Sequence, residues 1–330
     1  MNPLSNRWRD LPDYILGVTR EIWEDRGIET LNRTYAADIP VRTPMGVSRG
    51  NQGVIASTMA TLHEFPDRRL YGEDVIWSGG GTDDFLSSHR IISTGTHSAD
   101  GWFGAATGRR FQVRVIADCA VRQDVIVDEW LVRDNGGIVR QLGGDPRTFA
   151  RDLVAREGGP AKAGRPFGPD MDVAGPYAGT GNEDPWGRRY AETLTRLMQA
   201  DFAHGLRAYD RAALAEHAGG RSLLGAEAVA DSWLALRASF PSARFEIHHR
   251  IGMEGGLMPP RAALRWSLDG VHDGWGAFGR PTGARVHVMG MAHAEYGPYG
   301  PDGASIRREC ALWDEVAIWK QILLHTGEAS

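Results

Sequence analysis

The most regular alternation of apolar and polar residues along the chain lies at 125–134, which reads VIVDEWLVRD. Successive side chains of a strand point to opposite faces. One face of this strand would therefore carry Ile126, Asp128, Trp130, Val132 and Asp134. Two carboxylates and an indole on one face are costly to bury unless that face lines a cavity or meets solvent. We interpret this face as the wall of a ligand pocket.

The same type of pattern predicts the other elements of the chain. Apolar residues at helical spacing, with glycine and proline as boundaries, predict helices at 11–25, 28–36, 50–64, 138–142, 147–156, from 185, at 208–217, 224–239 and 316–325. Alternating segments predict strands at 68–77, 85–96, 110–122, 125–134, 243–253, 261–272, 284–296 and 304–315, and the prolines of 38–44 indicate an extended segment.

The chain repeats itself at a nearly constant offset. An offset of 175 residues matches Phe65-Pro66 with Phe240-Pro241, and an offset of 180 matches Asp134 with Asp314. Two copies of this length can each bury a core, so the repeat predicts tandem domains. We expect a first domain at 1–143, a Gly- and Pro-rich linker at 144–184 and a second domain at 185–330. Helices followed by strands within each copy are typical of an α+β fold.

The composition of the chain excludes several classes of partner and site. The 330 residues carry a formal net charge of −5, which disfavours nucleic acid as a partner. No apolar run near the start resembles a signal peptide, and none approaches the length of a membrane span, so we expect a cytoplasmic protein without a membrane partner. Two cysteines are too few for a disulfide framework, and the histidine spacing does not suggest a metal site.

The repeated unit resembles the nuclear transport factor 2-like superfamily and, more narrowly, the SnoaL-like polyketide cyclase family. The resemblance is carried by Ile126-Val127-Asp128-Glu129-Trp130, by Asp134 and by the run Gly137-Ile138-Val139-Arg140-Gln141-Leu142-Gly143. It covers roughly 11–143 and, more weakly, 186–325. It implies two tandem cone-shaped domains, each with three helices packed on a curved, largely antiparallel sheet. It also implies an intrachain pseudo-dimer and leaves further homo-oligomerisation open.

The resemblance further implies chemistry without a cofactor. In that family a carboxylate abstracts a proton next to a carbonyl, and a polar group, often histidine, steadies the enolate. By position, the second domain offers Asp314 with His293, which is our preferred catalytic pair, and the first offers Asp134 with Asp118. The expected ligand is a small apolar or carbonyl-containing compound. The predicted pocket residues are Trp130, Asp128, Met289, Met291, Trp313 and His287.

Two other classes of function remain open on the sequence. The same carboxylates would serve an isomerase, a dehydratase or a hydrolase of the superfamily. A non-catalytic ligand-binding module is the other alternative, because a duplicated domain can keep only an interface role. Asp134 and Asp314 also lie at strand-to-helix junctions, where an Asp often caps the helix that follows. Whether either one points into a closed apolar pocket distinguishes the catalytic reading from the structural one.

Overall fold

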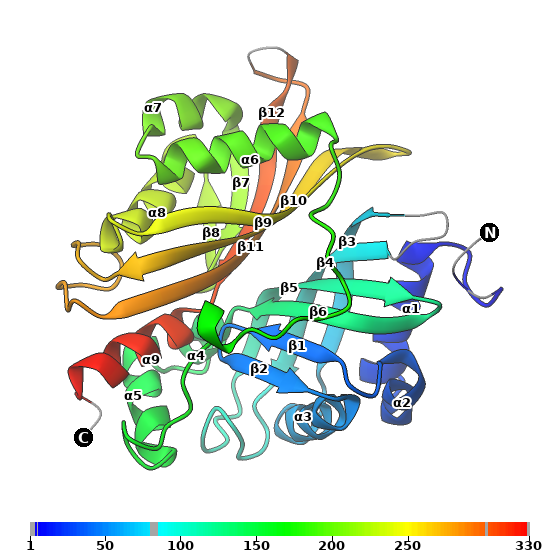
Figure 1. The fold of residues 1–330 in the computed structure, drawn as a ribbon, viewed down its shortest axis with the longest axis vertical. Helices are drawn as coiled ribbons and strands as arrows, with labels where there is room; N and C mark the ends of the chain where they lie inside the picture. The colour runs from blue at the N-terminus through cyan, green and yellow to red at the C-terminus, as the bar shows by residue number, and fades with distance from the viewer. Residues whose placement is uncertain (1–3, 5, 80–84, 301–302, 329–330) are drawn as a thin grey trace.

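The computed structural model describes residue 4 and residues 6–79, 85–300 and 303–328. Its strands form two six-stranded sheets, in the orders β2-β1-β6-β5-β4-β3 and β8-β7-β12-β11-β10-β9 (Figure 1). The first sheet comprises β1 (Pro40–Thr43), β2 (Gly46–Arg49), β3 (Arg69–Ser78), β4 (Phe85–Thr96), β5 (Arg110–Arg122) and β6 (Val125–Arg133). The second comprises β7 (Tyr209–His217), β8 (Arg221–Leu224), β9 (Arg244–Gly255), β10 (Met258–Val271), β11 (Arg285–Gly297) and β12 (Ser305–Trp313). Neighbours are antiparallel except β1 with β6 and β7 with β12.

Helices accompany each sheet in the same order. The first domain contains α1 (Leu11–Trp23), α2 (Leu31–Thr34), α3 (Asn51–Glu64) and α4 (Asn135–Gln141). The second contains α6 (Pro185–Met198), α7 (Phe202–Gly205), α8 (Ala226–Ser239) and α9 (Glu315–Thr326), and α5 (Pro146–Arg156) lies between the two. Short 3₁₀ turns are at Ile28–Thr30, Pro169–Met171 and Leu206–Ala208. The α+β class and the two tandem cone-shaped domains are as predicted.

The strand registers support the duplication. Arg90 lies opposite Ile116 in the first sheet, and Arg265 lies opposite Met291 in the second, so both members of the pair shift by 175 residues. The helix boundaries agree as well. Asp134 and Asp314 are the N-caps of α4 and α9, and Phe65 and Phe240 are the C-caps of α3 and α8.

One predicted element is wrong. Residues 208–217, predicted as a helix, form strand β7 (Tyr209–His217). β7 pairs with β12 on one side and with β8 on the other, and Ala213, Ala215 and His217 turn inward. The backbone hydrogen bonds of both neighbours and the burial of this face outweigh a helix preference of a few tenths of a kcal/mol per residue.

The two sheets pack against each other through the faces that their own helices leave free (Figure 1). An apolar cluster at this interface contains Ile116, Val132, Met289, Met291 and Leu312. Buried ion pairs lie around it. Arg265 Nη1 is 3.1 Å from Asp118 Oδ2, and Arg261 Nε is 3.1 Å from an Asp74 oxygen. Each sheet is therefore covered on both faces, by helices on one side and by the other sheet on the other.

The connection at 144–184 is held to both domains. Helix α5 packs against α9 through Leu153 and Leu323. The Tyr177 hydroxyl is 2.8 Å from His249 Nε2, and Phe167 is buried against the apolar cluster between the sheets. Although it has little regular structure after α5, this segment thus has apolar and polar anchors along its length.

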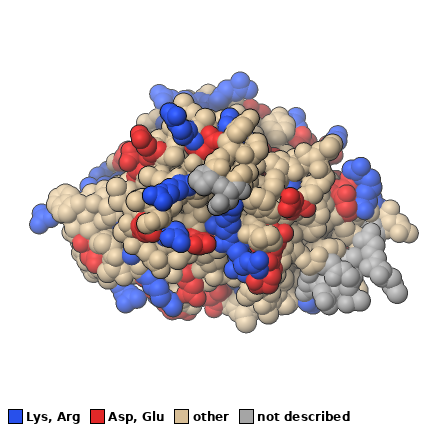
Figure 2. Space-filling model, turned by 90° about the horizontal axis from the view of Figure 1, so that it is seen from above, with Lys and Arg blue, Asp and Glu red and all other residues tan. Residues whose placement is uncertain are grey.

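The outer surface carries charges of both signs. On the face in Figure 2, acidic and basic side chains are interspersed, and its described residues present no extended basic surface of the kind that nucleic acid binding uses. Among the described residues, no helix is both long enough and apolar enough to cross a membrane.

Candidate functional site

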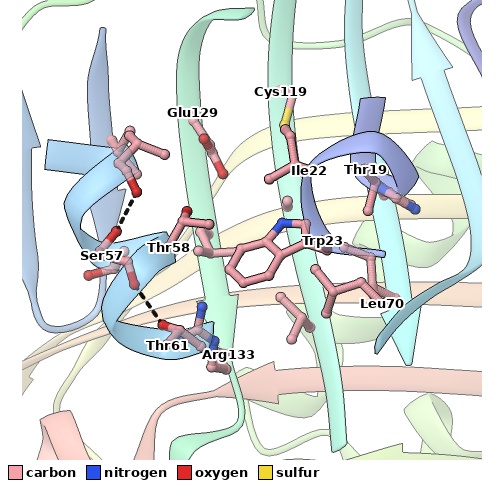
Figure 3. A pocket seen from close by; sticks show the side chains of 18 of the residues that line it. Thr19, Ile22, Trp23, Ser57, Thr58, Thr61, Leu70, Cys119, Glu129 and Arg133 are labelled. Atoms are coloured by element: carbon pink, nitrogen blue, oxygen red, sulfur yellow. Dashed lines mark hydrogen bonds between the residues drawn. The ribbon is translucent and has the colours of Figure 1, made fainter. Parts of the chain in front are cut away.

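The first domain encloses a cavity of about 380 Å³ between helices α1, α2 and α3 and its own sheet. Most of its wall is apolar, with Ile22 and Leu31 from the helical side and Leu70, Ile91 and Val115 from the sheet. Figure 3 shows this space from close by, with Trp23 at its centre. A concave, largely apolar pocket with a few polar groups is the usual form of a small-molecule site.

Glu129 is one of the two carboxylates in this wall. It projects from β6 together with Leu131 and Arg133, whereas the residues between them point to the opposite face. Burial raises the pKa of Glu129 to about 7, although a hydrogen bond with Tyr35 acts in the opposite direction. A carboxyl group with a pKa near neutrality is suited to accept and return a proton at physiological pH.

His89, on β4, lines the same cavity. Burial lowers its pKa to about 4, so the imidazole is neutral near pH 7. Its Nε2 atom is buried and has no hydrogen-bond partner in the part of the chain that the structure describes. A neutral imidazole can donate or accept one hydrogen bond, which makes His89 a candidate partner for a polar atom of a ligand.

A second polar group of residues lies at the junction of the two domains. Arg133 and Asn135 of the first domain and Asp314 of the second all line the cavity. The Asn135 amide donates to Asp314 Oδ2 at 2.6 Å, and Val316 N donates to Asp314 Oδ1 at 2.9 Å. Burial raises the pKa of Asp314 to about 7. The second domain thus contributes one carboxylate to the cavity of the first, but both oxygens of that carboxylate are already hydrogen-bonded.

The other three predicted catalytic residues lie outside the cavity. Asp134 caps α4 and accepts hydrogen bonds from the backbone amides of Gly137, Gly219 and Gly220 at 2.7–2.8 Å. Asp118 is paired with Arg265 between the sheets. His293 does not contact Asp314, and its Nε2 atom is 2.8 Å from the Ser88 hydroxyl at the same interface. The structure therefore brings together neither the pair Asp314 with His293 nor the pair Asp134 with Asp118.

The six predicted pocket residues also lie elsewhere. Asp128 forms a buried ion pair with Arg42, and Trp130 stacks on the guanidinium groups of Arg42 and Arg265. Met289 and Met291 fill the interface between the sheets, His287 contacts Phe167, and Trp313 belongs to the core of the second domain. The correction has one main cause. The face of β6 that carries Asp128 and Trp130 is directed toward the opposite sheet, and Arg42 of β1 neutralises Asp128 there. The cavity lies on the other face of β6.

The second domain differs from the first at three positions that line this cavity. At the positions of Thr58, Ile91 and Arg133, which line the first cavity, it carries tryptophans. These are Trp233, Trp266 and Trp313, each at most 2% exposed, with ring centroids 5.6–6.3 Å apart. The three indoles fill the cup from within. The candidate site is therefore in the first domain.

Glu309, the repeat partner of Glu129, is hydrogen-bonded to side chains of its own domain. Glu309 accepts hydrogen bonds from the hydroxyls of Tyr190 and Tyr209 at 2.8 and 2.6 Å and from Trp233 Nε1 at 3.2 Å, and it lies 2.7 Å from His217 Nε2. The carboxylate of the second cup is thus surrounded by protein donors, whereas Glu129 borders a cavity. In the sequence, the match between Glu129 and Glu309 across the duplication was the signal that could have identified Glu129 as a candidate site residue.

Replacing Asp134 by Ala tests whether that carboxylate is a helix cap. Three backbone amides would lose their acceptor, so we expect the free energy of unfolding to fall by about 1–2 kcal/mol. Catalytic turnover per folded molecule should stay the same, since the side chain does not reach the cavity. Urea denaturation and a rate measurement on the same sample check both parts. A normal midpoint together with lost turnover would return Asp134 to the list of catalytic residues.

In the described part of the chain, no group of three or more His, Cys, Asp or Glu side chains is arranged to hold a metal ion.

Comparison with known proteins relates the first domain to one protein family. Residues 14–142 match the model of the SnoaL-like polyketide cyclase family. No curated protein matches the chain at a significant level.

Among solved structures, the chain is similar to wild-type IdmH, a putative polyketide cyclase from Streptomyces antibioticus, with 27% identity and a TM-score of 0.35 over 40% of this chain and 97% of that one. It is also similar to TsrD from Streptomyces laurentii, with 22% identity and a TM-score of 0.33 over 40% of this chain and 91% of that one. A putative polyketide cyclase from Acidithiobacillus ferrooxidans matches with 19% identity and a TM-score of 0.35 over 39% of this chain and 91% of that one.

Proposed function

Residues 14–142 belong to the SnoaL-like polyketide cyclase family, and from this premise we propose that the first domain catalyses cofactor-free acid–base chemistry on a small, largely apolar carbonyl compound. The observation that carries the proposal is the position of Glu129, a carboxylate with a pKa near 7 in the wall of a largely apolar cavity. This assignment replaces the catalytic pairs that the sequence favoured.

In the proposed reaction, Glu129 accepts a proton from the carbon next to a carbonyl group. The C–H bond breaks, its electron pair moves toward the carbonyl oxygen, and an enolate forms. The enolate carbon then attacks a second carbonyl of the same molecule, which forms a C–C bond and an alkoxide. The protonated Glu129 returns its proton to that alkoxide. The apolar wall excludes water, which strengthens every electrostatic interaction with the enolate.

A simple ketone tests the first step without knowledge of the natural substrate. We expect the wild-type protein to accelerate the exchange of the methyl hydrogens of 2-acetylnaphthalene in D₂O, followed by ¹H NMR. This ring system is apolar, and the exchange requires only proton abstraction and return. If the protein leaves the exchange rate at the value measured in buffer alone, the proposal that Glu129 acts as a base on such ketones is wrong.

The pH dependence of this exchange follows from the pKa of Glu129. Only the ionised carboxylate accepts a proton, and a pKa raised to about 7 places half of the protein in that form near neutrality. The rate at low substrate concentration should therefore rise about tenfold per pH unit below pH 6 and become level above pH 8. A profile that is already level from pH 5 upward would indicate a base with an ordinary carboxyl pKa.

Two alternatives use the same cavity. An isomerase or dehydratase would also begin with proton abstraction, so exchange at a carbon next to a carbonyl would support these reactions equally, and product analysis separates them from ring closure. A non-catalytic binding module is favoured by one observation: the second domain keeps the same fold with a cup filled by tryptophan. Tight binding of the ketone without any exchange would support that alternative.

A further inference from the structure

Among the residues that the structure describes, two arginines at the cavity form no ion pair with a carboxylate. Arg68 and Arg133 both line the cavity, and Arg68 is only 2% exposed. Arg68 donates from Nε to the Ser93 hydroxyl at 3.2 Å and lies over the Trp23 ring. The Nε atom of Arg133 is buried without a hydrogen-bond partner. Within the described residues, no carboxylate oxygen comes within 4.0 Å of either guanidinium group, so most of their donors remain free for a ligand.

Other buried arginines of this protein are paired. Arg42 binds Asp128, Arg90 binds Glu73 and Glu295, and Arg265 binds Asp118. This is the normal arrangement, because a buried guanidinium stays protonated and is costly without a counter-charge. Arg68 and Arg133 depart from it. Burial lowers the pKa of both guanidinium groups, and repulsion from Arg133 adds to the effect at Arg68. Nearby carboxylates, Glu64 at Arg68 and Asp314, Glu129 and Glu64 at Arg133, act in the opposite direction.

The acids nearest to the two arginines are already hydrogen-bonded to other groups. Glu64 accepts from the backbone amides of Trp102 and Phe103 at 3.1 and 2.7 Å, and Asp314 accepts from Asn135 and Val316. Glu129 projects from the same strand as Arg133, but four residues away. At about 3.3 Å per residue, that spacing separates their Cα atoms by about 13 Å along β6. The two charges still act on each other, since each shifts the pKa of the other group toward its charged form, but they form no ion pair within 4.0 Å.

The duplication provides an internal comparison. The position of Arg68 is occupied by Ala243 in the second domain, and the position of Arg133 is occupied by Trp313. Both cations are thus absent from the cup that is filled. Charge and open space occur together in this protein, as expected if the charges serve a ligand and not the fold.

We propose that Arg68 and Arg133 bind a carboxylate of the substrate, so that the substrate class is an apolar keto acid. The reacting carbonyl, whose role rests on the proposed function, lies at the Glu129 end of the cavity, and the carboxylate lies at the Arg133 end. Figure 3 shows Glu129 and Arg133 at the two ends of the space, with the Trp23 ring between them in that view. An apolar spacer connects the two functional groups, because Glu129 and Arg133 are four residues apart on β6. Bidentate contacts with guanidinium groups are the strongest form of carboxylate recognition in proteins.

A matched pair of probes tests the inference on the full-length protein. 6-Acetyl-2-naphthoate carries both groups on a rigid apolar spacer, and its methyl ester has the same shape without the charge. By titration calorimetry we expect the acid to bind at least about tenfold more tightly than the ester, and we expect the difference to shrink with added salt. The variants Arg68→Met and Arg133→Met should each remove most of the preference for the acid. Arg244→Met, which changes an exposed arginine of the second domain, is the control and should keep it.

Equal affinity of acid and ester for the wild-type protein would overturn the inference, and so would a preference that survives in both arginine variants. The wild-type comparison requires no variant, so the test stands even if one of them fails to fold. The two proposals fail separately. Acid preference without hydrogen exchange leaves the carboxylate site in place and removes the proposed reaction. Exchange of 2-acetylnaphthalene without acid preference does the reverse.

Discussion

Glu129→Gln is expected to lower the hydrogen-exchange rate of 2-acetylnaphthalene about 10²–10⁴-fold. The amide keeps the shape of the side chain and cannot accept the proton. The free energy of unfolding should change little, because burial already raises the pKa of Glu129 to about 7 and the neutral carboxyl closely resembles the amide. The NMR exchange rate above pH 8 measures the first effect, and urea denaturation near pH 5, where the buried carboxyl of the folded protein is protonated, measures the second.

The duplication supplies a matched control for this substitution. Glu309→Gln changes the equivalent carboxylate of the second domain, which is bonded to Tyr190, Tyr209, His217 and Trp233 and does not border the cavity. It should lower the thermal midpoint and leave the exchange rate per folded molecule unchanged. If Glu129→Gln exchanged at the wild-type rate, or if both variants lost the same fraction of activity, Glu129 would not be the base.

Asp118→Ala is expected to lower the free energy of unfolding by about 3–5 kcal/mol. The substitution leaves Arg265 charged and buried between the sheets, with the Trp130 face as its main remaining contact. The carboxylate itself does not line the cavity, so turnover per folded molecule should be retained. Denaturant titration followed by tryptophan fluorescence measures the loss.

An exposed ion pair gives the control for Asp118. Asp152 lies beside Arg151 on the surface of α5, where both side chains are more than half exposed. Asp152→Ala should change stability by no more than about 1 kcal/mol, because solvent screens such a pair. A variant Asp118→Ala with normal stability and no activity would restore Asp118 as a catalytic residue and would contradict its structural assignment.

Local pattern was sufficient for most of the fold. Period-two alternation and helical spacing depend only on neighbouring residues, and they located β3 to β6 and their repeats to within a few positions. The duplication then confirmed each element with an independent copy. The exceptions are β7, which was predicted as a helix, and the short strands β2 and β8, which were not predicted. The local pattern carries no information about the strands that pair with these three.

The position of the candidate site could not be predicted from local pattern, and β6 shows why. Its alternation showed two faces, and the sequence alone determined that Asp128 and Trp130 share one of them while Glu129 and Arg133 share the other. Which face meets helices and which meets the second sheet depends on how the domains pack. In a protein whose sheets are covered on both sides, polar residues on either face are buried, and only their partners distinguish an ion pair from a cavity wall.

The choice between the two cups was likewise decided by packing. The sequence determined that Thr58, Ile91 and Arg133 have tryptophans as repeat partners, but an indole can line a pocket as readily as fill it. In the folded chain Trp233, Trp266 and Trp313 converge on one another and occupy the second cup, and the smaller or charged residues leave the first one open. Residue types and their spacing are local properties of the chain, whereas an empty volume exists only between elements brought together from distant parts of it.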